Sequence, residues 1–212
     1  MDMHDSIAQP AATTSNMTLS QVVSTLKFGP FSVSSQVFHV SRSRLSYALV
    51  NLKPLLPGHV LVCPSRCVPR LSQLTSQETA DLFVTVRRVS RTIERLYQAS
   101  SMNVAVQDGV DAGQSVPHVH VHIIPRKSED LKDKGGGDAI YGMMDGEPGN
   151  VGKAFMEMQQ IRESRTNGKD FAQGPDAERK PRTDAEMSGE AAWLRDEMEN
   201  DGLEETSDDS RD

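Results

Sequence analysis

Three histidines alternate with apolar residues in the run HVHVHIIPR, residues 118–126. Successive side chains of a strand point to opposite faces, so His118, His120 and His122 are predicted to share one face, about 6.6 Å apart. Their apolar neighbours are predicted to fill the other face as core. Burying three ionisable rings together without partners is costly, which indicates that the histidine face does chemistry.

Four interpretations of the histidine face are open at this point. Histidines that only decorate a solvated strand fit least, because such a strand carries mixed polar residues rather than a strict repeat. A zinc site needs further ligands, and the preceding loop offers Gln107, Gln114 and Ser115, which are poor zinc ligands. Phosphoryl chemistry fits better, since a neutral imidazole is a nucleophile near neutral pH and the amides around Gly109 and Gly113 can approach phosphate oxygens. A binding module without turnover would use the same residues.

The elements that position these histidines are predicted from their periodicity. Period-two or short apolar runs predict strands within 28–40, 45–50, 59–63, 102–107 and 117–125. A helix is predicted over 75–99, because apolar residues recur there every three or four positions and Thr75 with Glu78 forms a capping box. Strands, one crossing helix and strands again indicate the α+β class, with an antiparallel sheet covered on one face by the helix.

The composition indicates one folded domain with extensions. The expected divisions are a disordered extension (1–24), the domain (25–142), a flexible insertion (143–182), a C-terminal helix of the domain (183–198) and an acidic tail (199–212).

Charge is distributed unevenly along the chain, whose net charge is -7. Residues 1–144 hold 14 basic and 11 acidic side chains, whereas residues 145–212 hold 9 and 19. A mildly positive body suits a small anionic ligand, and its scattered basic residues argue against nucleic acid as a partner. No apolar run approaches the ~20 residues of a membrane helix, so no membrane partner is expected.

Two cysteines, Cys63 and Cys67, are too few for a disulfide framework or a complete zinc site. Because no secretory leader is seen either, we expect a reducing location inside the cell, in the cytoplasm with the nucleus as a second place.

The residues around the triad resemble the histidine triad family, and within it the fragile histidine triad branch of dinucleoside triphosphate hydrolases. The resemblance covers residues 28–142 and the terminal helix. It rests on SYALVNLKPLLPGHVLVCP (46–64), ADLF (80–83), MNVAVQDGVDAGQSVPHVHVHIIPRK (102–127) and AEMSGEAAWLRDEM (185–198). It implies a histidine-triad-like fold and a symmetric homodimer formed through the helix and the adjoining sheet edge.

The resemblance also implies a role for each matching residue. His120 corresponds to the nucleophile that attacks the α-phosphorus of a dinucleoside polyphosphate such as diadenosine triphosphate. A nucleotidyl-histidine intermediate follows, and AMP and ADP are the products. His118 corresponds to a residue that orients the nucleophile, His122 to a phosphate-side donor and His59 to a fourth histidine bonded within the triad. The substrate contacts implied are Gln114 at the phosphates, Asn51, Gln107 and Ser115 as further polar contacts, Phe28, Leu49 and Leu61 as the apolar wall for a base, and Tyr141 in a nearby loop.

No protein-bound cofactor or metal is expected, and Mg²⁺ or Mn²⁺ would arrive with the polyphosphate. Two other functions stay open. One is a nucleoside phosphoramidase or nucleotidyltransferase of a neighbouring branch, which differs in its leaving group, although Gln114 favours the polyphosphate branch. The other is a signalling module whose output is the nucleotide-loaded complex, with slow hydrolysis.

Overall fold

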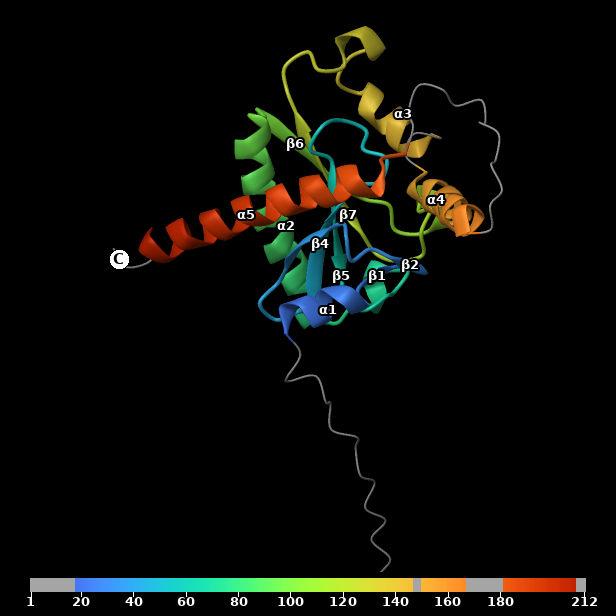
Figure 1. Cartoon of the computed structure of the whole chain (residues 1–212). Coiled ribbons are helices and arrows are strands. Elements are labelled where there is room, and N and C mark those ends of the chain that lie inside the picture. The colour runs from blue at the N-terminus through green and yellow to red at the C-terminus, as the bar shows by residue number, and fades with distance from the viewer. Residues whose placement is uncertain (1–17, 147–149, 167–180, 209–212) are drawn as a thin grey trace, which may run out of the picture.

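A five-stranded antiparallel sheet forms the centre of the computed structural model, which describes residues 18–146, 150–166 and 181–208 (Figure 1). The strand order is β3-β4-β5-β7-β6. The strands are β3 (Val37–Val40), β4 (Ser46–Val50), β5 (Val60–Pro64), β6 (Ser101–Val106) and β7 (Val121–Arg126). A separate hairpin pairs β1 (Lys27–Phe28) with β2 (Phe31–Ser32). With the helices described below, this arrangement confirms the predicted α+β class.

The long helix α2 (Ser76–Tyr97) packs against β4, β5, β6 and β7. Its start confirms the predicted capping box, because the Thr75 side chain accepts from the Glu78 amide while the Glu78 carboxylate accepts from the Thr75 amide. Leu82, Val89 and Ile93 are completely buried on one side of the helix. The helical spacing of these apolar residues thus supplies the layer that covers the sheet.

The register of the central strands aligns three side chains that matter for the site. His122 of β7 lies opposite Leu61 of β5, and Leu61 lies opposite Leu49 of β4. Residues directly opposite each other in a ladder share a face of the sheet. The histidine face therefore continues across the sheet as an apolar surface, whereas Val121 and Ile123 point to the other face.

Helix α1 (Leu19–Thr25) overlaps the end of the segment predicted to be disordered (1–24), so the prediction is wrong for residues 19–24. A second capping box, between Thr18 and Gln21, satisfies the first amides of the helix. Val23 is partly buried against the core, which gives the helix a tertiary contact. The rest of the predicted extension, 1–17, lies outside the described residues.

Two helices occupy the segment predicted as a flexible insertion, α3 (Ala139–Asp145) at its start and α4 (Val151–Thr166) within it. The prediction is wrong for α4 because Phe155 and Met158, three positions apart, bury their side chains against the main core. Helical order there comes from this tertiary contact rather than from local composition. Residues 147–149 and 167–180 of the predicted insertion lie outside the described part of the chain.

The last helix, α5 (Asp184–Asp208), starts as predicted and continues ten residues past the predicted end at 198. It packs against α2, β3 and β4 and crosses the body of the molecule in Figure 1. Arg95 of α2 pairs with Glu197 and Asp201, and the Thr92 hydroxyl donates to Asp201. These contacts extend the helix into the predicted acidic tail, of which 209–212 lie outside the described residues.

Within the described residues, three single-turn 3-10 helices connect the larger elements: η1 (Leu71–Gln73), η2 (Val110–Ala112) and η3 (Lys132–Lys134). None of the helices in the described segments has the length and apolar character needed to cross a bilayer.

Candidate active site

The three histidines of the motif are buried next to one another, but only His122 belongs to a strand. The predicted strand over 117–125 begins at Val121, because the amide of Val119 donates to the Val68 carbonyl outside the sheet ladder. The ring centroids of His120 and His122 are 4.9 Å apart. The His118 ring lies beside Phe28, with the two ring centroids 5.8 Å apart.

The His118 ring is held by backbone groups at both nitrogens. Its Nδ1 accepts a hydrogen bond from the Gly29 amide at 3.1 Å, so Nε2 carries the proton and donates to the Pro64 carbonyl at 2.8 Å. These bonds join the β1–β2 hairpin to the end of β5. Because both ring nitrogens of His118 bond to backbone groups, the ring fixes the position of that backbone and has no nitrogen left for a phosphate.

His120 has one ring nitrogen engaged and the other available as a base. Its Nδ1 donates to the carbonyl of His118 at 2.7 Å, which leaves the lone pair on Nε2. The pKa of His120 is lowered to about 4, mainly by burial; the hydrogen bond to the His118 carbonyl opposes the shift and the nearby His118 ring adds to it. The ring is therefore neutral at pH 7, which is the state required of a nucleophile.

A chain of hydrogen bonds through His59 determines which ring nitrogen of His122 carries the proton. The amide of Leu55 donates to His59 Nδ1 at 3.0 Å, so the proton of neutral His59 sits on Nε2. That nitrogen lies 3.0 Å from His122 Nδ1 and donates to it. His122 must then carry its own proton on Nε2, and this buried atom has no hydrogen-bond partner in the described part of the chain.

His122 stays neutral for two reasons. Burial is the main cause that holds its pKa well below 6.5, and the neighbouring His120 and His59 rings add to the shift. The site thus presents an acceptor nitrogen on His120 beside a donor nitrogen on His122, on adjacent rings. A nucleophile next to an unused donor suits attack on a phosphorus atom whose oxygens need hydrogen bonds.

The predicted apolar wall is assembled beside the triad. Phe28, Leu49 and Leu61 are completely buried, and the Phe28 ring meets His120 edge-on with centroids 5.1 Å apart. Aromatic side chains from other elements pack against this surface. Phe155 of α4 lies 5.7 Å from Phe28 and stacks on Phe31 of β2.

The polar contacts predicted for the substrate occupy different environments. Asn51 lies in the histidine cluster, where its Oδ1 accepts from the Lys53 amide. Its Nδ2 lies 3.3 Å from His59 Nε2, and because both atoms are donors when Nε2 carries the proton, this is a contact and not a hydrogen bond. Gln114 is buried, and its amide donates to the Pro69 carbonyl at 2.9 Å. The Ser115 hydroxyl accepts from the amide of Gly152 on α4.

Two further predicted contacts lie at the edge of the site. Gln107 is half-buried, and its Nε2 lies 2.4 Å from where a side-chain carbon on Gly113 would be. Because φ at Gly113 is +85°, the backbone conformation there favours glycine, whereas the Gln107 side chain could move aside. Tyr141 is 59% exposed and lines a separate hollow.

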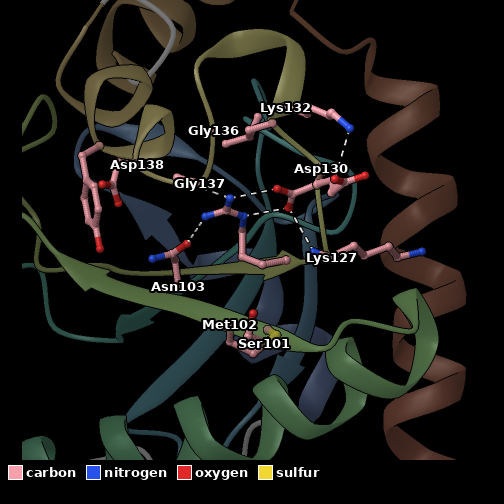
Figure 2. A pocket seen from close by; sticks show the side chains of 13 residues that line it. Ser101, Met102, Asn103, Lys127, Asp130, Lys132, Gly136, Gly137 and Asp138 are labelled. Carbon is pink, nitrogen blue, oxygen red and sulfur yellow. Dashed lines mark hydrogen bonds and ion pairs between the residues drawn. The ribbon is translucent and has the colours of Figure 1, made fainter.

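That hollow, of about 540 Å³, lies between β6, the end of β7 and the glycine-rich segment 135–137 (Figure 2). Its one arginine, Arg126, forms an ion pair with Asp130 and donates to Asn103 and to the Gly137 carbonyl. A guanidinium that is already satisfied by these groups is not available for a phosphate. Two lysines also line the hollow, Lys127 and Lys132, and Lys132 pairs with Glu129.

The described residues contain no group of three or more His, Cys, Asp or Glu arranged to hold a metal ion. The cysteines lie outside the site as free thiols, Cys63 buried and Cys67 exposed. Burial raises the pKa of the Cys63 thiol, so it remains protonated.

Four groups that shape the site were not identified in the sequence: the Gly29 and Leu55 amides, the Pro64 carbonyl and Phe155. Backbone donors and acceptors have no signature in a sequence, so the first three could not have been found. The sequence did carry a signal for Phe155, because Phe155 and Met158 have helical spacing within the segment that was predicted to be flexible.

Comparisons with known proteins point to one family. The HIT domain matches residues 34–129. A bis(5'-nucleosyl)-tetraphosphatase (asymmetrical) of Schizosaccharomyces pombe is 49% identical over 173 residues, which cover 80% of this chain and 92% of the yeast protein. A bis(5'-adenosyl)-triphosphatase of Saccharomyces cerevisiae is 41% identical over 193 residues, covering 81% and 91%. The crystal structure of the C. elegans NitFhit protein superposes with a TM-score of 0.54 at 33% identity, over 81% of this chain and 30% of that one.

Proposed function

Since the chain belongs to the HIT domain family, we propose that it hydrolyses dinucleoside polyphosphates, with His120 Nε2 as the nucleophile. The observation that carries this proposal is the hydrogen bond from His120 Nδ1 to the His118 carbonyl. It directs the lone pair to Nε2 of a neutral ring, and the adjacent His122 offers an unused donor.

The proposed reaction has two steps. In the first, His120 Nε2 forms a bond to the α-phosphorus of diadenosine triphosphate, and the bond from that phosphorus to the bridging oxygen breaks, so that ADP leaves with the electron pair. In the second, water attacks the same phosphorus and the N–P bond breaks, which releases AMP and one proton and restores His120. His122 Nε2–H donates to a phosphate oxygen whose negative charge grows in both steps.

The names of the relatives support the substrate class and leave the phosphate chain length open. One relative is named as a tetraphosphatase and the other as a triphosphatase. We propose the triphosphate as the first substrate to test, and we propose that Mg²⁺ or Mn²⁺ enters with the polyphosphate rather than on protein ligands.

The test is incubation of the purified protein with diadenosine triphosphate, diadenosine tetraphosphate and an adenosine phosphoramidate, with products separated by chromatography. AMP and ADP from the triphosphate are expected, with preference over the phosphoramidate. Faster release of AMP from the phosphoramidate would instead favour the neighbouring branch of the family. Turnover slower than dissociation of the nucleotide complex would favour the signalling module.

His120→Asn tests the nucleophile directly. The asparagine amide can donate to the His118 carbonyl as Nδ1 does, but it supplies no nucleophilic nitrogen, so turnover should be lost while AMP still binds. His39→Asn is the matched control, because His39 is a half-buried histidine of β3, and strands β4 and β5 separate β3 from the strand β7 that follows the triad. A near-normal rate for His120→Asn would contradict the mechanism.

We also propose that the protein is a cytoplasmic homodimer. Support for an interface comes from apolar side chains that are exposed on α2 and on the edge strand β6, namely Phe83, Val84 and Val104. The two free thiols suit a reducing compartment. Light scattering of the wild type and of Val104→Lys, together with imaging of a tagged protein, tests both points.

A further inference from the structure

Helix α4 places an aromatic side chain on the wall predicted to hold a base. The ring of Phe155 stacks on Phe31 with centroids 4.9 Å apart and planes 16° from parallel, and it contacts Phe28 at 5.7 Å. Phe155 is 3% exposed, and Phe28 is completely buried. In Figure 1, α4 lies beside the β1–β2 hairpin that carries both partner rings. The aromatic face that a purine would use is therefore already covered by the protein itself.

The first residues of α4 are also in close contact with the loop that precedes the triad. The Gly152 amide donates to the Ser115 hydroxyl at 3.2 Å. A side-chain carbon added to Gly152 would lie 2.4 Å from the Ser115 carbonyl oxygen, which is a backbone atom that cannot turn aside. Only glycine permits this approach, so α4 and the loop are matched in shape.

These two contacts engage both halves of the nucleotide site, the apolar wall and the phosphate loop. A base cannot stack on Phe31, or reach Phe28 from that side, while the Phe155 ring occupies this position. A phosphate oxygen would compete with the Gly152 amide for the Ser115 hydroxyl. We propose that α4 is a gate over the nucleotide site, in which Phe155 holds the place of a substrate base until the substrate displaces the helix. This inference rests on the proposed function and adds its regulation.

Two of the contacts that hold α4 are of the kinds that a nucleotide also offers. The Gly152 amide donates to the Ser115 hydroxyl, and Phe155 and Met158 bury their side chains, whereas Met156 between them is 54% exposed. A substrate that offers a base and a phosphate replaces both kinds of contact with its own. The apparent affinity is then the intrinsic affinity multiplied by the fraction of molecules in which the gate is open.

The test measures AMP binding by calorimetry in three variants of the full chain. Phe155→Ala removes the ring from the wall, and Gly152→Ala forces the helix away from the loop. Both should bind AMP more tightly than the wild type, by about tenfold if the closed state dominates by that factor. Met156→Ala is the matched control on the same helix, and its affinity should be unchanged. Unchanged or weaker AMP binding by Phe155→Ala overturns the gate, because the ring would then be neutral or part of the base site.

Amide hydrogen exchange distinguishes a gate that opens for the ligand from a clamp that closes on it, because the two change the exchange rate of α4 in opposite directions. If AMP displaces α4, the amides of residues 152–160 should exchange faster in the complex than in the free protein. Slower exchange would show a clamp that closes on the ligand and would overturn the gate.

Different results would overturn the gate and the proposed function. Hydrolysis of diadenosine triphosphate with no gain in AMP affinity overturns the gate alone. If neither hydrolysis nor AMP binding occurs in any variant, the proposed function falls and the gate falls with it.

Discussion

Lowering the pH from 7 to 5 should destabilise the folded protein, because its buried histidines stay neutral where unfolded ones gain a proton. The pKa of His120 and that of His39 are both lowered from 6.5 to about 4, mainly by burial, with Arg88 adding to the shift at His39 and Asp81 opposing it. Between these values the unfolded chain binds more protons than the folded one. Stability therefore falls as the pH drops from about 6.5 toward 4.

The magnitude follows from these two values. A histidine that titrates at 6.5 when unfolded and at about 4 when folded contributes a loss of about 2 kcal/mol between pH 7 and pH 5. His120 and His39 together give about 4 kcal/mol, and His118 and His122 add to it because burial shifts their pKa in the same direction. This is a large share of a typical stability of 5–15 kcal/mol. Glu78, whose pKa is lowered from 4.5 to about 2 mainly by Arg66, loses its stabilising effect only at lower pH.

Urea unfolding at pH 7 and pH 5, followed by the fluorescence of the single tryptophan, Trp193, measures the effect. The wild type should lose at least ~4 kcal/mol of unfolding free energy. His120→Asn and His39→Asn should each lose about 2 kcal/mol less, since asparagine does not titrate. If His120→Asn keeps the full pH dependence of the wild type, His120 is not held neutral by burial, and the assignment of its free lone pair fails with it.

Four further outcomes are expected. His122→Asn should lower kcat by about 10²–10³ with AMP affinity nearly unchanged, because it removes a donor to a developing charge; an equal loss in affinity would contradict this role. Thr75→Ala should reduce the unfolding free energy by about 1 kcal/mol in urea titrations through loss of the helix cap, without changing turnover per folded molecule. Leu61→Ala should cost about 2–5 kcal/mol of stability and also weaken AMP binding, whereas a purely structural role would leave binding intact. Extensive dialysis against EDTA should leave the melting temperature unchanged while hydrolysis returns with added Mg²⁺, and a fall in melting temperature would reveal a metal held by the protein.

Several parts of the fold were predictable because their causes are local. The α2 helix follows from apolar residues three and four apart and from one capping box, Thr75 with Glu78. The same kind of box at Thr18 and Gln21 was present in the sequence, and helix α1 shows that it is effective once Val23 has a core to contact. The end of α5 was placed too early because the contacts of Arg95 with Glu197 and Asp201 join residues about a hundred positions apart.

The residue types of the site and their alternation are properties of the sequence, since side-chain period and chemistry are decided over a few neighbouring positions. The residues of the apolar wall were implied by the family resemblance, and strand register places Leu49 and Leu61 on the histidine face. The protonation pattern that makes His120 an acceptor and His122 a donor belongs to the tertiary structure. It depends on partners that are distant along the chain, 89 residues between Gly29 and His118 and 63 between His59 and His122. The covering of the wall by Phe155 was decided in the same way, by packing between an aromatic hairpin and a helix that no short-range pattern connects.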